Sequence, residues 1–223
     1  MERTTRNTNN RIVKQHLILC EGRDAEEFLI AYLNSAALKD HDFFSNEIQV
    51  MNFGGNEDLY AYLSVLQNME GFHDIKSLLI VRDAETNARA AIDQIITPLR
   101  ATGFDCPDKP YVWGDGKIKT AFLLFPTCSA DVTEGTLEDL CLSILRESNN
   151  EEILEEIDSF MVTLENHYNR KFPHKFKTKL HTYFSVTDDY ISLKIGEAAR
   201  AHAFDWTHHN LAPLKEFILE IAT

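Results

Sequence analysis

The stretch from residue 77 to residue 82 constrains the fold of this chain most strongly. Its centre, Leu78-Leu79-Ile80-Val81, is apolar at every position, so an extended strand here would be apolar on both faces. Such a strand is typical of the middle of a parallel sheet, where helices cover both sides. The stretch therefore predicts an α/β fold.

The surrounding sequence alternates short apolar runs with helical patterns. Strands are predicted over residues 12–20, 48–53 and 77–82. Apolar residues at helical spacing follow each strand, over residues 25–36, 59–69 and 86–102, and Asn56 could cap the second of these helices. This order predicts a mainly parallel, Rossmann-like sheet flanked by helices.

The second half of the chain has a different pattern. Gly114-Asp115-Gly116 between the apolar runs 111–113 and 118–125 predicts a β-hairpin beside the parallel sheet. From Thr136 onward the periodicity is helical, with the last helices expected at 175–184, 190–201 and 211–221. We therefore expect a flexible polar leader (1–10), an α/β core (11–148) and a helical C-terminal region (149–223).

Composition limits the classes of function. With 22 Lys and Arg against 35 Asp and Glu, the formal net charge is −13, so any contact with nucleic acid should be local or mediated by metal. The four cysteines are far apart and form no zinc or redox motif. No apolar run approaches the roughly 20 residues of a membrane span. We expect a cytoplasmic protein with reduced thiols.

Acidic residues gather where predicted strands end. The carboxyl ends of neighbouring parallel strands meet at one sheet edge, where ligands bind. Carboxylates from separate loops repel one another there unless a hard cation such as Mg²⁺ or Mn²⁺ lies among them. Each could instead be only a helix cap or a partner of a helix dipole. The candidate metal ligands are Glu21, Asp24, Asp83, Glu85, Glu138 and Asp139.

Several ordered motifs resemble a known fold. Glu21-Gly22 after the first strand and Asp83-Ala84-Glu85 after the third are similar to the Toprim domain of topoisomerases, primases and OLD-type nucleases. The full set more closely resembles the uncharacterised Toprim-like family DUF3226. The further motifs are Phe125-Pro126, Gly-Thr-Leu-Glu-Asp-Leu at 135–140, Leu-Lys-Ile-Gly-Glu-Ala at 193–198 and Pro-Leu-Lys-Glu-Phe at 213–217.

The resemblance implies roles for some of these residues. Glu21 would act in acid–base catalysis or bind metal, and Asp83 and Glu85 would bind the divalent ion, with Glu85 in place of the usual second Asp. Glu138 and Asp139 would complete the site. No Tyr or Ser nucleophile of topoisomerase type is evident, so metal-activated water would attack a phosphodiester.

A basic segment interrupts this acidic chain. Residues 166–187 contain no Asp or Glu, and aromatic residues are interleaved with the cations, which suits a nucleic-acid contact. Alternatively the aromatics belong to a helix core and the lysines are merely solvated. The candidate nucleic-acid contacts are Arg170, Lys171, Lys175, Lys177 and Lys179. In OLD-type nucleases a lysine can assist the metal, and Lys175 and Lys179 are candidates for that role.

A histidine-rich stretch near the C-terminus has two interpretations. His202, His208 and His209 could bind a metal with Asp205, or could be ordinary surface groups.

Three functions remain open. We expect a Mg²⁺- or Mn²⁺-dependent nuclease or phosphodiesterase acting on nucleic acid. The alternative is a non-catalytic Toprim-like module that binds a metal, a nucleotide or a partner ATPase. The third is an aspartyl phosphatase with Asp83 as the nucleophile, because Asp83-Ala84-Glu85-Thr86 follows an apolar strand.

Overall fold

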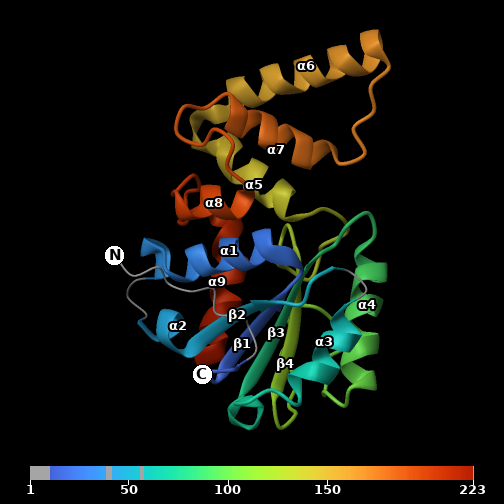
Figure 1. Ribbon diagram of the computed structural model, residues 1–223, viewed down its shortest axis with the longest axis vertical. Coiled ribbons are helices and arrows are strands. Elements are labelled where there is room, and N and C mark those ends of the chain that lie inside the picture. The colour runs from blue at the N-terminus through green and yellow to red at the C-terminus, as the bar shows by residue number, and fades with distance from the viewer. Residues whose placement is uncertain (1–10, 39–41, 56–57, 223) are drawn as a thin grey trace.

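The computed structural model describes residues 11–38, 42–55 and 58–222, and its centre is a four-stranded sheet (Figure 1). All neighbouring strands pair in parallel, in the order β2-β1-β3-β4. The predicted Rossmann-like α/β architecture is confirmed, and the doubly apolar strand lies inside the sheet. The strands are β1 (His16–Cys20), β2 (Ile48–Asn52), β3 (Ser77–Asp83) and β4 (Lys119–Phe125).

Helices cover both faces of the sheet. Because side chains alternate along a strand, Leu79 and Val81 enter one hydrophobic core while Leu78 and Ile80 enter the other. The first core is covered by α1 (Gly22–Leu33), α2 (Asp42–Glu47), α5 (Leu137–Leu145), α8 (Ile195–Arg200) and α9 (Ala212–Leu219). The second is covered by α3 (Leu59–Leu66) and α4 (Ala88–Ala101). Short 3₁₀ helices span Ala36–Leu38, Phe72–Asp74, His209–Leu211 and Glu220–Ala222.

The strand register aligns the carboxyl ends of β1 and β3, where the candidate site residues follow. Cys20 at the end of β1 pairs with Val81 of β3, and Asp83 at the end of β3 pairs with Phe125 of β4. The carboxyl ends of β1 and β3 therefore lie side by side, as the sequence predicts.

Two long helices form an arm beyond the sheet. A π-helical turn, Arg146–Asn150, connects α5 to α6 (Glu151–Tyr168), against which α7 (Lys175–Ser185) packs. The pair stands out from the body of the molecule (Figure 1). Leu154 and Leu180, one from each helix, belong to the same buried cluster as the first face of the sheet. The expected boundary at residue 148 thus falls within the turn, and one core crosses it.

The predicted β-hairpin is wrong. The sheet is entirely parallel, and residues 111–113 form no strand in the described structure. Tyr111 has a positive φ of 61°, and its side chain and that of Trp113 stack on Phe217 of α9, with ring centroids 4.6 and 5.0 Å apart. In the part of the chain that the structure describes, two backbone hydrogen bonds join this segment to β4, from Tyr111 to Phe122 and from Gly114 to Thr120. Packing on the C-terminal helix replaces strand pairing.

Several smaller expectations can be compared directly. The helix expected over 190–201 begins only at Ile195, because Ser192 has a positive φ of 65° and Glu197 accepts a hydrogen bond from the backbone N–H of Lys194. The polar leader 1–10 and the cap Asn56 lie outside the described residues. The four cysteines are buried and carry free thiols. Within the described ranges, each helix is too short or too polar to cross a lipid bilayer.

Candidate metal centre at the carboxyl edge of the sheet

Glu21 is held at the sheet edge by a buried arginine. It directly follows β1 and precedes α1, and its backbone N–H donates to the carbonyl of Val81 at 3.3 Å. Its Oε2 accepts a hydrogen bond from Nε of Arg82 at 2.8 Å. The Arg82 side chain is fully buried, whereas the Glu21 side chain is 19% exposed. Strand β3 therefore sets the position of the first acidic candidate.

Asp83 joins the end of β3 to the start of α5. Its Oδ1 accepts a hydrogen bond from the backbone N–H of Leu137 at 2.8 Å. Burial raises the pKa of Asp83 to about 7, and the neighbouring carboxylates of Glu138, Glu85 and Glu21 act in the same direction, while the Leu137 hydrogen bond opposes them. The site therefore disfavours negative charge on Asp83 when no cation is present.

Glu85 is exposed, and its backbone has an unusual conformation. Its φ is 54°, and it exchanges two backbone hydrogen bonds with Gly135, at 2.9 and 2.7 Å. Gly135 has a φ of 116°, and a Cβ there would lie 2.8 Å from Cδ of Pro126. Only glycine fits this position, which joins the loop after β3 to the loop before α5.

The remaining acidic candidates each take part in local structure. Asp139 accepts hydrogen bonds from the backbone N–H and the hydroxyl of Thr136, and the backbone bond belongs to a capping box at the start of α5. Asp24 accepts a hydrogen bond from the backbone N–H of Gly196 at 3.3 Å and so links α1 to α8. Glu138 is turned inward, with a side chain only 13% exposed.

Several of these carboxylates act on one buried thiol. Burial raises the pKa of Cys141 in α5, and four carboxylates raise it further: Glu138, Asp83, Asp24 and Asp139. Together with the groups that act on Asp83, these effects place each of the six acidic candidates within electrostatic reach of Asp83 or Cys141. Carboxylates are the ligands that a hard divalent cation such as Mg²⁺ or Mn²⁺ prefers, and a cation would offset the effects that raise the pKa of Asp83. Sequence reasoning missed the buried partner Arg82.

The basic segment is largely occupied by ion pairs. Lys175 lies 3.8 Å from Glu165, Lys179 is buried against Asp158, and Lys177 lies 3.8 Å from Oε1 of Glu138. The two lysines proposed to assist a metal thus contact other acids, and Lys177 is the one that reaches the carboxylate edge. The other two candidate cations, Arg170 and Lys171, are exposed.

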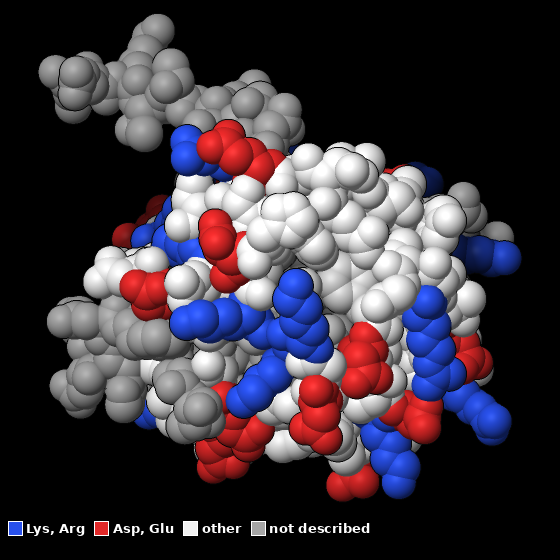
Figure 2. All heavy atoms as spheres, turned by 90° about the horizontal axis from the view of Figure 1, so that it is seen from below, with Lys and Arg blue, Asp and Glu red and all other residues white. Residues whose placement is uncertain are grey.

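The opposite end of the molecule has a surface of mixed charge where the structure describes it. Figure 2 shows the molecule from below, where the strands begin, and basic and acidic side chains are interspersed on this face. A surface of mixed sign does not favour a polyanion.

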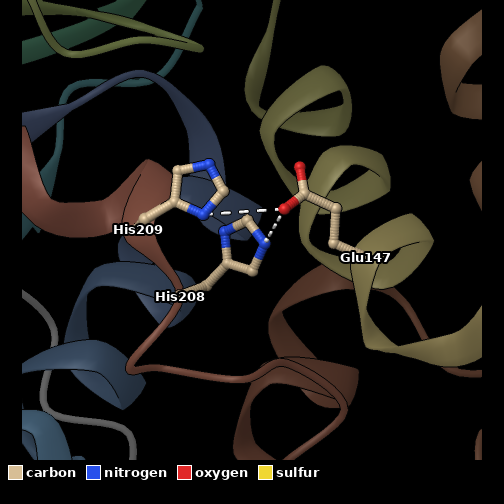
Figure 3. A group of neighbouring side chains, drawn as sticks. All are labelled: Glu147, His208 and His209. Carbon is tan, nitrogen blue, oxygen red and sulfur yellow. Dashed lines mark hydrogen bonds and ion pairs between the residues drawn. The ribbon is translucent and has the colours of Figure 1, made fainter.

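The histidines form a compact group with an unexpected partner. Nε2 of His208 and Nδ1 of His209 lie 3.2 and 3.5 Å from Oε2 of Glu147 (Figure 3). Asp205 instead accepts two hydrogen bonds from Thr207. Among the described residues, Glu147, His208 and His209 are the group whose potential ligand atoms all lie within 4.8 Å of one another. The carboxylates of the sheet edge are less tightly gathered.

Comparison with known proteins is limited to one family. No curated protein and no solved structure matches the chain. The family described as "Protein of unknown function (DUF3226)" matches residues 15–223, which include all four strands and all the acidic candidates. The chain therefore belongs to the DUF3226 family.

Proposed function

We propose that this protein is a Toprim-type, divalent-metal-dependent phosphodiesterase or nuclease that acts on nucleic acid. The observation that carries the proposal is Asp83, which burial and three neighbouring carboxylates hold at a pKa of about 7 at the carboxyl end of β3. Perturbed acids of this kind cluster at functional sites. A bound cation would offset the repulsion that raises this pKa.

The residues divide into ligands and a proton-transfer group. Asp83, Glu85 and Glu138 would hold Mg²⁺ or Mn²⁺. The ion would lower the pKa of a bound water and stabilise charge on the phosphodiester oxygens. Glu21 adjoins this set, and Arg82 fixes its side chain, so it is placed to exchange a proton with water or with the leaving oxygen.

Nucleic acid would approach from the side of the arm. Lys177 extends from α7 to Glu138 and keeps half of its side chain exposed. Arg170 and Lys171 are exposed just before α7. These three cations can contact phosphates while the carboxylates hold metal.

Cleavage of labelled DNA and RNA tests this function. The purified chain is incubated with each substrate in Mg²⁺, Mn²⁺ or chelator. We expect metal-dependent products that Asp83→Asn abolishes. Asp93→Asn, an equivalent change at an exposed position of α4, is the matched control and should leave the rate unchanged. Products that persist in chelator, or that persist with Asp83→Asn, would exclude this mechanism.

A second candidate function is a non-catalytic module that binds a metal, a nucleotide or a partner ATPase. It is favoured because three of the five candidate nucleic-acid cations, Lys175, Lys177 and Lys179, contact acidic side chains. Calorimetry that detects Mg²⁺ binding, together with no cleavage of either nucleic acid, would support this function.

The aspartyl phosphatase is the third candidate. It requires Asp83 as an ionised nucleophile, whereas burial favours the neutral acid. Trapping of a phospho-aspartyl adduct would establish this function over the other two.

A further inference from the structure

The group formed by Glu147, His208 and His209 lies where the arm joins the body of the molecule. Glu147 belongs to the π-helical turn between α5 and α6, whereas the two histidines are at the start of the 3₁₀ helix His209–Leu211. Glu147 and His208 are 61 positions apart in sequence. Asn210, which follows the two histidines, donates a side-chain hydrogen bond to the hydroxyl of Ser143 at 2.9 Å. This bond fixes the histidine loop against α5.

Both histidines direct a ring nitrogen toward the same carboxylate oxygen (Figure 3). The separations from Oε2 of Glu147 are 3.2 Å for Nε2 of His208 and 3.5 Å for Nδ1 of His209. Two ligand atoms bound tetrahedrally to one zinc ion, with bonds of about 2.0–2.1 Å, lie about 3.3–3.4 Å apart. These two separations agree with this spacing, and the two histidine nitrogens lie within 4.8 Å of each other. The two rings are stacked with centroids 4.5 Å apart.

We propose that Glu147, His208 and His209 form a binding site for a transition-metal ion, with Zn²⁺ as the expected ion. Two imidazole nitrogens and one carboxylate oxygen are borderline donors that favour Zn²⁺ over Mg²⁺. Three protein ligands leave the fourth tetrahedral position for water. The site is separate from the carboxylates of the sheet edge and does not depend on the proposed nuclease function.

Access to the group is open on one side. The side chains of His209 and Glu147 are 71% and 50% exposed, while that of His208 is only 7% exposed. Glu147 also lines a cavity of about 400 Å³, together with Ser143, Arg146 and Lys175. An ion can therefore reach the two exposed ligands before it engages the buried imidazole.

The hydrogen bonds of His208 show that zinc binding must change the tautomer of this histidine. The backbone N–H of Asn210 lies 3.2 Å from Nδ1 of His208, and an N–H can only donate, so Nδ1 is the acceptor. Neutral His208 therefore carries its proton on Nε2, directed at Glu147. Coordination through Nε2 requires that proton to move to Nδ1, which opens the contact with Asn210. The tautomer of His208 thus reports occupancy of the site.

Binding would link two segments that are distant in sequence. Glu147 belongs to the π-helical turn that leads into α6 of the arm, and the histidines lie at the 3₁₀ helix that leads into α9 of the body. An ion shared between them stabilises the folded state, because the ligands are not preorganised in the unfolded chain.

Zinc titration of the full chain by calorimetry, in excess Mg²⁺, tests the proposal. We expect one saturable zinc per chain, with affinity reduced about tenfold or more by either His209→Ala or Glu147→Gln. The matched control is His202→Asn, which removes an exposed histidine of the same segment at a φ of 62° that Asn tolerates, and it should leave the affinity unchanged. His209 is mostly exposed, so its removal leaves the fold intact, and circular dichroism checks this.

Nitrogen-15 spectra of the histidine rings provide a second readout. Zinc should convert His208 from the Nε2–H to the Nδ1–H tautomer in the wild-type chain. The proposal is overturned if zinc does not saturate the chain, or if His209→Ala and Glu147→Gln bind zinc as tightly as the wild type. It is also overturned if Asp83→Asn, rather than the histidine variant, removes the zinc, because the ion would then occupy the carboxylate edge.

Discussion

Asp83 accepts a hydrogen bond from the backbone N–H of Leu137, 54 positions later in the chain. This contact joins the end of β3 to the first turn of α5, where backbone N–H groups have no partner within the helix. It also keeps a half-buried carboxylate near Glu138. Local structure and the chemistry of the candidate centre therefore depend on the same carboxylate, and the two roles can be separated by substitution.

Asp83→Asn should abolish divalent-metal binding yet preserve the fold. The amide oxygen of Asn can still accept from Leu137, while the repulsion among carboxylates decreases. In metal-free buffer at pH 8 we expect the free energy of unfolding to rise by about 1–4 kcal/mol. Urea denaturation and Mg²⁺ calorimetry measure the two effects, and a large loss of metal-free stability would identify Asp83 as a structural residue.

The stability of the metal-free chain should fall as pH rises. The pKa of Asp83 is about 7 in the folded state and near 3.8 when unfolded, so between these values the folded state binds the additional proton. The free energy of unfolding should therefore decrease between about pH 4 and pH 7, by at most about 4 kcal/mol, and then level off. Denaturation at pH 5 and pH 8 in chelator checks this. Saturating Mg²⁺ or the Asp83→Asn variant should flatten the dependence, and an equally steep curve for that variant would assign the effect to another group.

The elements of the fold that the sequence predicted correctly are those whose apolar pattern requires burial. Residues 78–81 are apolar on both faces, which indicates an internal parallel strand whatever the rest of the chain does. The hairpin prediction failed because the Gly114-Asp115-Gly116 signal is local. The conformation of this segment depends instead on Phe217, about a hundred positions away, on which Tyr111 and Trp113 stack.

The candidate site divides in the same way. Glu21 and Asp83 were predictable at one edge because strand ends align in a parallel sheet. The contact of Arg82 with Glu21 was not predictable, because an arginine next to a strand end is more often solvated than buried. Glu147 was also missed, since no periodicity relates it to His208, and only the packing of the C-terminal segment against α5 brings them together.

Gly135→Ala should destabilise the protein and weaken metal binding. Alanine would have to adopt a φ of 116° with its Cβ 2.8 Å from Pro126, so we expect a loss of about 2–5 kcal/mol in the free energy of unfolding. Gly103→Ala is the matched control, because Gly103 has a φ of 81° but nothing within 4 Å of an added Cβ. It should lose only about 1–2 kcal/mol. Equal losses in thermal or urea denaturation would show that the contact between Gly135 and Pro126 is unimportant.

The lysines of α7 should separate into one structural and one binding residue. Lys179 is buried against Asp158, so Lys179→Gln should lower the free energy of unfolding by about 1–3 kcal/mol. Lys177 is half exposed beside Glu138, so Lys177→Gln should leave stability within about 0.5 kcal/mol of the wild type.

For nucleic-acid binding, in contrast, we expect Lys177 to matter more than Lys179. Each phosphate contact contributes about 0.7 to 0.9 to the slope of log K against log salt concentration, because a contact releases counterions. Lys177→Gln should therefore flatten the slope by roughly one contact, as measured by fluorescence anisotropy with labelled DNA and RNA across a salt series. Lys175→Gln is the comparison within the same helix, because Lys175 pairs with Glu165 and not with the carboxylates of the sheet edge. If Lys177→Gln leaves the slope unchanged while binding is otherwise measurable, α7 does not face the nucleic acid, and the ion pair with Glu138 serves only to hold the arm against the sheet edge.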